Sequence, residues 1–223
     1  IALLLRILEE RMAYDAVGGY YLPWHPMTML HLAVYILAAV LAILAVLRLP
    51  LEEGDQRDCT MLGRAGVFTV LVSAALVGVG TALFVGGLGA SSFEVPWLER
   101  ALAVASALSF LALAALGADT GNKRGGLLSK LSLATLSLFY CLWLLYQYRY
   151  HAANPARNAF LWESLAIALA AVGVSQYMGF FYEAAQGKRC CGILLYGEFA
   201  LLAALPDEKR LALRLLLLAS AIL

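Results

Sequence analysis

Two charged residues lie inside the last two apolar runs of this sequence. Glu198 is near the centre of the run 191–205, and Arg214 is inside the run 211–223. A carboxylate at the centre of a membrane helix costs about 2.5–3.5 kcal/mol, so it indicates a partner, a proton or a function. If 191–223 folds as a hairpin, Arg214 comes within one helical turn of Glu198. Two interpretations therefore stand side by side: a structural ion pair, and a protonatable or cation-binding carboxylate.

Polar residues of the preceding run, 160–182, extend this candidate site. Gln176 lies deep in the run, and Tyr177 follows it. A buried glutamine is more often directed at protein than at lipid, and a Gln176 directed at Glu198 would form a polar centre between the two runs. The sequence thus predicts a ligand- or ion-binding site made of Glu198, Gln176, Arg214 and Tyr177.

A second group of candidate residues gathers on one side of the predicted bundle. It is expected to line an outer vestibule and consists of His31, Tyr35, Trp143, Trp162 and Glu163. An interfacial aromatic belt is the ordinary explanation, although a belt marks both membrane faces. A one-sided cluster also suits an aromatic, cationic or quinone-like ligand.

Signals for catalysis and for metals are missing from the sequence. The four cysteines show no zinc-like spacing, and there is no H-E-x-x-H or G-x-S-x-G motif. His31 and His151 would suit haem ligation from two helices, but a hydrogen-bonded helix histidine is far commoner. We therefore expect no metal site, and nothing in the sequence argues for hydrolytic or nucleophilic catalysis. A quinone or haem belongs only to a redox hypothesis.

The composition explains why these polar groups stand out. Of 223 residues, 63% are hydrophobic and 14% are charged, whereas soluble domains have about 45–50% and 25%. The net charge of +1 gives no electrostatic footprint for nucleic acid. These figures predict an all-α, polytopic membrane helical bundle whose main partner is the lipid bilayer.

Apolar runs long enough to cross about 30 Å of hydrocarbon indicate the helices. With two shorter runs they predict seven transmembrane helices, or six as a fallback: 27–47, 65–88, 101–118, 127–146, 160–182, 191–205 and 211–223. Residues 27–223 are expected to form a single transmembrane domain.

Residues 1–26 have a different pattern. Arg6, Glu9 and Glu10 share one face of a helix, and Leu4 and Leu8 share another. This pattern favours an amphipathic helix in the membrane interface, followed by an aromatic loop. The tail of an upstream membrane helix is the alternative.

A stripe of small residues marks the second run. It consists of Ala74, Gly78, Ala82, Gly86 and Ala90, spaced strictly by four. Small residues at this spacing let two helices approach closely. We expect packing within the chain, and as the alternative a homo-oligomer or a partner membrane subunit on the same face.

The orientation of the chain is weakly marked. Lys and Arg divide evenly between the two sides, and they favour an outside N-terminus only if the last hairpin is left out. This predicts a multi-pass protein of the cell (inner) membrane with its N-terminus outside.

Three functions fit these features. The first is a small-solute or ion transporter, channel or membrane-embedded solute-binding subunit with a polar centre in the fifth to seventh helices. The second is a membrane anchor, scaffold or sensor subunit. The third is a quinone- or haem-linked redox subunit. The scarcity of intramembrane charge places the first ahead.

Overall fold

The computed structural model describes residues 2–15, 20–22, 24–48, 64–87, 96–118, 127–151, 159–180, 187–206 and 210–223. These segments form eight α-helices and one two-stranded antiparallel ribbon. In chain order the elements are α1 (Ala2–Met12), β1 (Tyr14–Asp15), β2 (Tyr20–Tyr21), α2 (Pro26–Arg48), α3 (Arg64–Gly87), α4 (Pro96–Ala118), α5 (Leu127–His151), α6 (Ala159–Phe180), α7 (Gly187–Ala204) and α8 (Leu211–Ile222). The predicted all-α bundle is confirmed.

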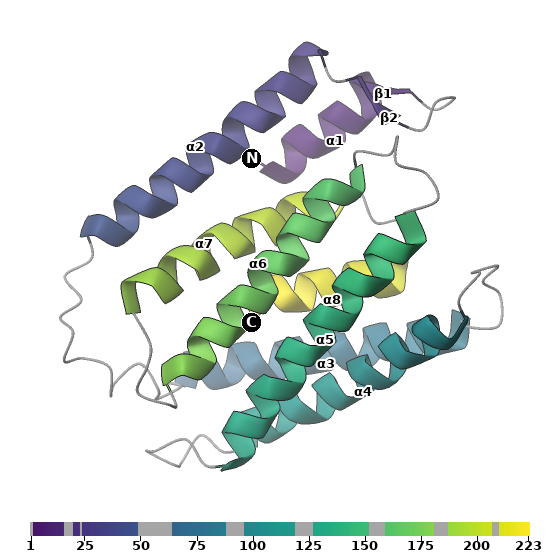
Figure 1. Ribbon diagram of the computed structural model, residues 1–223, viewed down its shortest axis with the longest axis vertical. Helices are drawn as coiled ribbons and strands as arrows, with labels where there is room; N and C mark the ends of the chain where they lie inside the picture. Colours follow the sequence, from purple (N-terminus) through teal and green to yellow (C-terminus); the bar gives the residue numbers. More distant parts are fainter. Residues whose placement is uncertain are drawn as a thin grey trace.

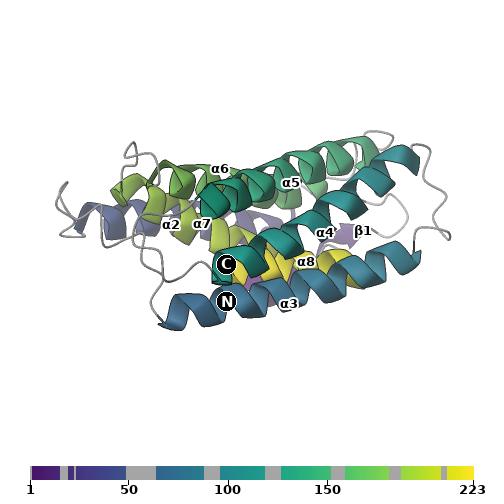
Figure 2. The same ribbon diagram turned by 90° about the horizontal axis from the view of Figure 1, so that it is seen from below.

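The helices from α3 to α8 form a closed ring of neighbours. Each packs on the next one in the chain, and α8 also packs on α3. As a result α8 lies between α3 on one side and the α5–α6 pair on the other (Figures 1 and 2). Helix α2 stands outside this ring and packs on α7 and α1.

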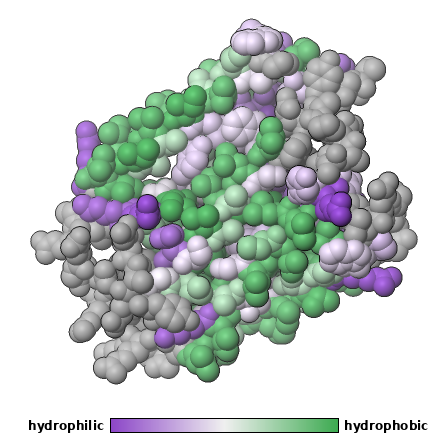
Figure 3. Space-filling view, in the orientation of Figure 1, coloured by the Kyte–Doolittle hydropathy of each residue, from purple (hydrophilic) through white to green (hydrophobic). Residues whose placement is uncertain are grey.

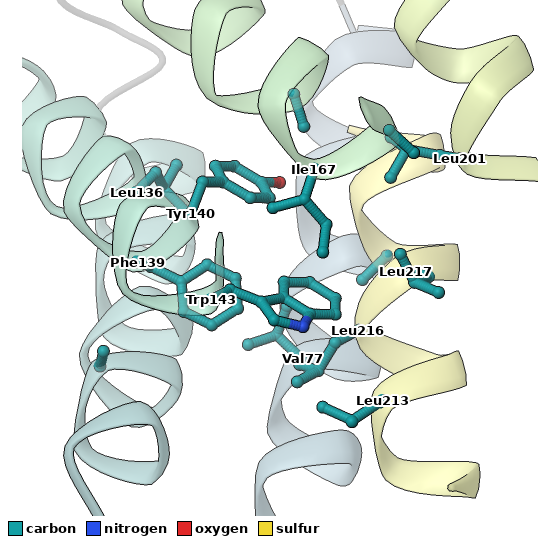
Figure 4. Packing of buried hydrophobic residues seen from close by; sticks show 14 of the residues in the cluster. Val77, Leu136, Phe139, Tyr140, Trp143, Ile167, Leu201, Leu213, Leu216 and Leu217 are labelled. Atoms are coloured by element: carbon teal, nitrogen blue, oxygen red, sulfur yellow. The ribbon is translucent and has the colours of Figure 1, made fainter. Parts of the chain in front are cut away.

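The core of the ring is built from aromatic and leucine side chains. Trp143 of α5 is completely buried, with its ring centroid 5.4 Å from that of Phe139. It lies beside Val77 of α3 and Leu216 of α8 (Figure 4). Helices in lipid associate through close van der Waals packing, so the fit of these side chains holds the ring together.

Five helices, α2 to α6, are long and apolar enough to span a membrane. Seven spans were predicted. Helix α7 is present but has 18 residues, including Lys188, Arg189 and Glu198. Helix α8 has 12 residues, or about 18 Å at 1.5 Å per residue. The number of candidate spans is therefore lower than predicted, because α7 carries three charged residues and α8 is short. The five apolar helices make this an integral membrane protein.

Helix α1 is the predicted amphipathic helix, but its charged face points inward. Arg6 and Glu9 are completely buried, whereas Leu4 and Met12 are 63% and 60% exposed. The helix packs on α2 and α7. An interfacial helix would turn its charged face to water. Here the protein covers that face, and the apolar face is left on the outside.

The first half of the small-residue stripe packs within the chain. Ala74 is buried, and a Cβ atom on Gly78 would lie 3.2 Å from the ring of Phe110 in α4. The closest approach to α8 uses a different face of α3. A Cβ on Gly80 would lie 3.1 Å from the carbonyl oxygen of Ala212.

The second half of the stripe is exposed. Ala82 and Gly86 face outward, and nothing lies within 4 Å of a Cβ on Gly86. Ala90 lies outside the described residues. Positions four apart drift by about 40° per step on a helix of 3.6 residues per turn, so the stripe cannot stay on one face. Oligomerisation through it stays a prediction.

Candidate functional site

A cavity of about 630 Å³ that is open on one side lies beside the end of α8. Residues from all six helices of the ring, α3 to α8, line it. Most of the wall is apolar and includes Leu116, Leu133, Leu169, Val174, Leu195 and Leu201. A polar group on such a wall is therefore conspicuous.

Glu198 is the charged residue on this wall. Its side chain is exposed to the cavity and makes no hydrogen bond or ion pair with the described residues. The residue before it, Gly197, is buried against α6, where a Cβ would lie 3.5 Å from that of Leu169. This close approach of α6 and α7 places Glu198 at the cavity.

Three hydroxyl groups share the cavity with Glu198. They belong to Tyr140, Tyr177 and Ser220. Ser220 donates to the carbonyl of Leu216 at 2.8 Å, and the hydroxyls of Tyr140 and Ser220 are hydrogen-bonded to each other.

Two residues of the predicted site lie elsewhere. Arg214 is exposed, and its guanidinium donates to the carbonyl of Pro206 at 3.4 Å. Among the described residues no ion pair joins it to Glu198. Gln176 is half-buried and does not line the cavity. The structure therefore brings Glu198 and Tyr177 to one site, without Gln176 or Arg214.

A buried ionic cluster ties α1 to α2. Arg6 Nη1 lies 2.5 Å from Glu9 Oε2, and His31 Nδ1 contacts the same oxygen. Ionised Glu9 can only accept, so Nδ1 carries the proton and donates it. All three residues are at most 1% exposed. The guanidinium of Arg6 also lies 4.1 Å from the ring centroid of Tyr21, a cation–π contact.

The charge of Glu9 depends on this cluster. Burial by itself would raise the pKa of Glu9, but the hydrogen bond from His31 and the positive charge of Arg6 outweigh it. The net result is a pKa below the ordinary value of 4.5. Glu9 is therefore ionised at neutral pH.

The residues predicted to line an outer vestibule are packed. His31, Tyr35 and Trp162 form one aromatic cluster, in which the Tyr35 and Trp162 ring centroids are 4.3 Å apart. Trp143 is in the core. Glu163 is buried and accepts a hydrogen bond from the Gln147 side chain. None of the five predicted residues lines the cavity.

Another buried carboxylate lies at the same end of the bundle. Arg210, just before α8, donates to Glu99 of α4 at 3.3 Å and to the Tyr146 hydroxyl of α5 at 2.7 Å. Burial opposes the charge on Arg210, but Tyr146, Tyr150 and Glu99 raise its pKa. This contact fixes the start of α8 against α4 and α5.

Sequence reasoning did not assign several of these residues to a site. Tyr140 and Ser220 gave no signal, because hydroxyl residues in membrane helices are common. Arg6 and Glu9 did give one, since charges inside the run IALLLRILEE are unusual. Comparison of the chain with protein-family models, curated proteins and solved structures found no match, so the function is inferred from the geometry alone.

Proposed function

We propose that this membrane protein binds a small organic cation with an apolar body beside Glu198, as a transporter, channel or solute-binding subunit. The observation that carries the proposal is a carboxylate without a partner among the described residues on the wall of an apolar cavity. Such a group needs a counter-charge or a proton. A cationic solute would supply the counter-charge.

The size and the other polar groups of the cavity support this class of ligand. Its volume of about 630 Å³ is within the roughly 300–1,000 Å³ of small-molecule sites. Leucine and valine side chains would contact the apolar body. The rings of Tyr140 and Tyr177 add faces that attract quaternary ammonium groups.

Equilibrium binding of radiolabelled tetraethylammonium to the purified protein in detergent tests the proposal. The wild-type protein should bind it saturably. Glu198→Gln should weaken binding by at least about tenfold, which corresponds to about 1.4 kcal/mol. The matched control is Glu10→Gln, which removes a carboxylate from α1 and should change nothing. Equal affinities of the wild type and Glu198→Gln, or no saturable binding by the wild type, would refute the proposal.

A second measurement separates transport from binding alone. Proteoliposomes that take up tetraethylammonium faster than protein-free liposomes support a transporter or channel, and binding without uptake supports a solute-binding subunit. Native mass spectrometry tests the anchor alternative. A heteromeric mass without retained solute favours an anchor or scaffold over the proposed site.

For the orientation we propose an outside N-terminus in the inner membrane. The end that carries α1 also holds the exposed Trp24 and Trp97, whereas Arg48, Lys188 and Arg189 lie at the other end. Cations gather on the cytoplasmic side of membrane proteins. Because Lys and Arg divide evenly between the two sides, they support this orientation only if the last hairpin is left out.

A further inference from the structure

A narrow groove lies on the side of α7 opposite the cavity. The cavity contacts Leu194, Leu195 and Glu198, whereas the groove contacts Gly192, Ile193 and Tyr196. These two sets lie on different faces of the same helix, as the 100° step per residue requires. The groove has a volume of about 310 Å³ and is lined on its other sides by α2 and by Leu169 of α6.

The side chains along the groove are apolar. The residues that α2 contributes are Ala39, Ala42, Ile43, Val46 and Leu47. Gly192 lets α2 approach α7, since a Cβ there would lie 3.0 Å from Val46. The small side chains of Ala39 and Ala42 on α2 leave room in the groove that suits a hydrocarbon chain.

One end of the groove is positively charged. Lys188 and Arg189 line it, and Arg48 follows Leu47 at the end of α2. All three side chains are exposed, and none has an ion pair or hydrogen bond with the described residues. Figure 3 shows the apolar surface of α2 ending in hydrophilic atoms where α2 ends and α7 begins.

Acidic residues of the described segments lie away from this end. Glu9, Glu10, Glu99 and Glu163 are at the opposite end of the bundle, and Glu198 is on the other face of α7. The groove therefore combines an apolar length with cations that have no acidic partner among the described residues, at the boundary of the bundle. That combination matches the chain and the phosphate of an anionic phospholipid.

We infer that the α2–α7 groove binds one anionic phospholipid, with an acyl chain along α2 and its phosphate against Lys188 and Arg189. A free phosphate ion would use the cations but leave the apolar groove empty. A zwitterionic lipid would fill the groove but gain less from the cations, because its own ammonium group offsets the phosphate charge. The site does not involve Glu198 and is independent of the proposed function.

Lipid retention measured by native mass spectrometry tests this inference. The whole protein is purified with equal amounts of phosphatidylglycerol and phosphatidylcholine of the same acyl chains. The wild type should retain one phosphatidylglycerol in preference to phosphatidylcholine. Lys188→Gln/Arg189→Gln should reduce that preference by about 10- to 30-fold. The matched control, Arg100→Gln/Arg149→Gln, removes two exposed cations at the opposite end and should keep it.

A second variant tests the apolar part of the site. Ala42→Trp fills the groove without touching the cations, so it should also abolish retention, while the melting temperature reports whether the variant is folded. Three results would overturn the inference. The first is an unchanged lipid preference in the Lys188→Gln/Arg189→Gln variant, and the second is equal retention of the two lipids by the wild type. The third is that 10 mM inorganic phosphate displaces the lipid as completely as added phosphatidylglycerol does.

Discussion

Replacement of Glu9 by glutamine tests whether the buried ionic cluster holds α1 on the bundle. The change keeps the size of the side chain but removes the carboxylate charge that contacts the completely buried guanidinium of Arg6. Removal of one partner from a buried ion pair costs about 3–5 kcal/mol. Because α1 packs mainly on α2 and α7, the cost falls on the docking of α1, and the ring can stay folded.

Hydrogen exchange of the α1 amides in detergent measures this docking. A cost of 3–5 kcal/mol corresponds to a loss of protection of roughly 100- to 4,000-fold, unless α1 is held by less than that. Arg6→Met/Glu9→Leu removes both charges and should restore most of the protection, since apolar pairs of similar size replace buried ion pairs well. Glu10→Gln is the control. Full protection in Glu9→Gln would refute this account of α1, as would a double variant as unprotected as the single one.

Acid should release α1 by the same route. The pKa of Glu9 is below 4.5 in the folded protein, so the released helix takes up the proton more readily. The stabilisation is therefore complete above about pH 4.5 and is lost as the pH falls through the folded pKa. Protection of α1 should be constant from pH 7 to 5 and should fall at lower pH, while in Arg6→Met/Glu9→Leu it should not change.

Two further predictions concern α8 and its neighbours. Arg210→Gln should lower the free energy of unfolding by about 1–3 kcal/mol, because buried Glu99 loses the positive charge of Arg210. Since the pKa of Arg210 is raised, Arg210 stays charged from pH 5 to 9. Thermal unfolding should therefore show the same loss across that range. Gly80→Ala should also cost about 1–3 kcal/mol, because its Cβ would meet the carbonyl of Ala212. Gly86→Ala, in open space, should be neutral, and equal melting temperatures of the two alanine variants would contradict the packing of α3 on α8.

Hydropathy predicted the helices well because a membrane helix satisfies all of its backbone hydrogen bonds internally. The run 27–47 became α2 and the run 160–182 became α6 with shifts of one or two residues. The predicted run 101–118 began five residues late, since α4 starts at Pro96. Proline fits the first turn of a helix, where its missing N–H has no partner to lose, and the charges at Glu99 and Arg100 had hidden that turn.

Contacts between helices were less predictable. A tight hairpin of α7 and α8 was the basis for pairing Glu198 with Arg214. In the structure α8 turns toward α3 instead, where Ser73 donates to the carbonyl of Ala219 at 2.9 Å and Gly80 admits the helix closely. Small residues on α3 therefore determine where α8 packs. The general tendency of consecutive elements to pack on each other does not determine it.

The contact between His31 and Glu9 was also beyond the sequence. Periodicity placed Arg6 and Glu9 on one face of α1, but it gives no information about which distant helix covers that face. A buried carboxylate requires a partner, which limits the choice to a few residues such as His31 and Arg48. Only the packing of α1 beside the start of α2 selects His31.

Helix α7 shows why charge content alone misjudges a membrane helix. Lys188, Arg189 and Glu198 set it apart from the five apolar spans, yet none of these side chains has to face lipid hydrocarbon. Helices α2, α6 and α8 surround it, Glu198 opens into the cavity, and the two cations lie at the end of the bundle. A helix shielded by its neighbours can carry charge at low cost. The residues that lower its apolar character are therefore the ones on which both proposed sites depend.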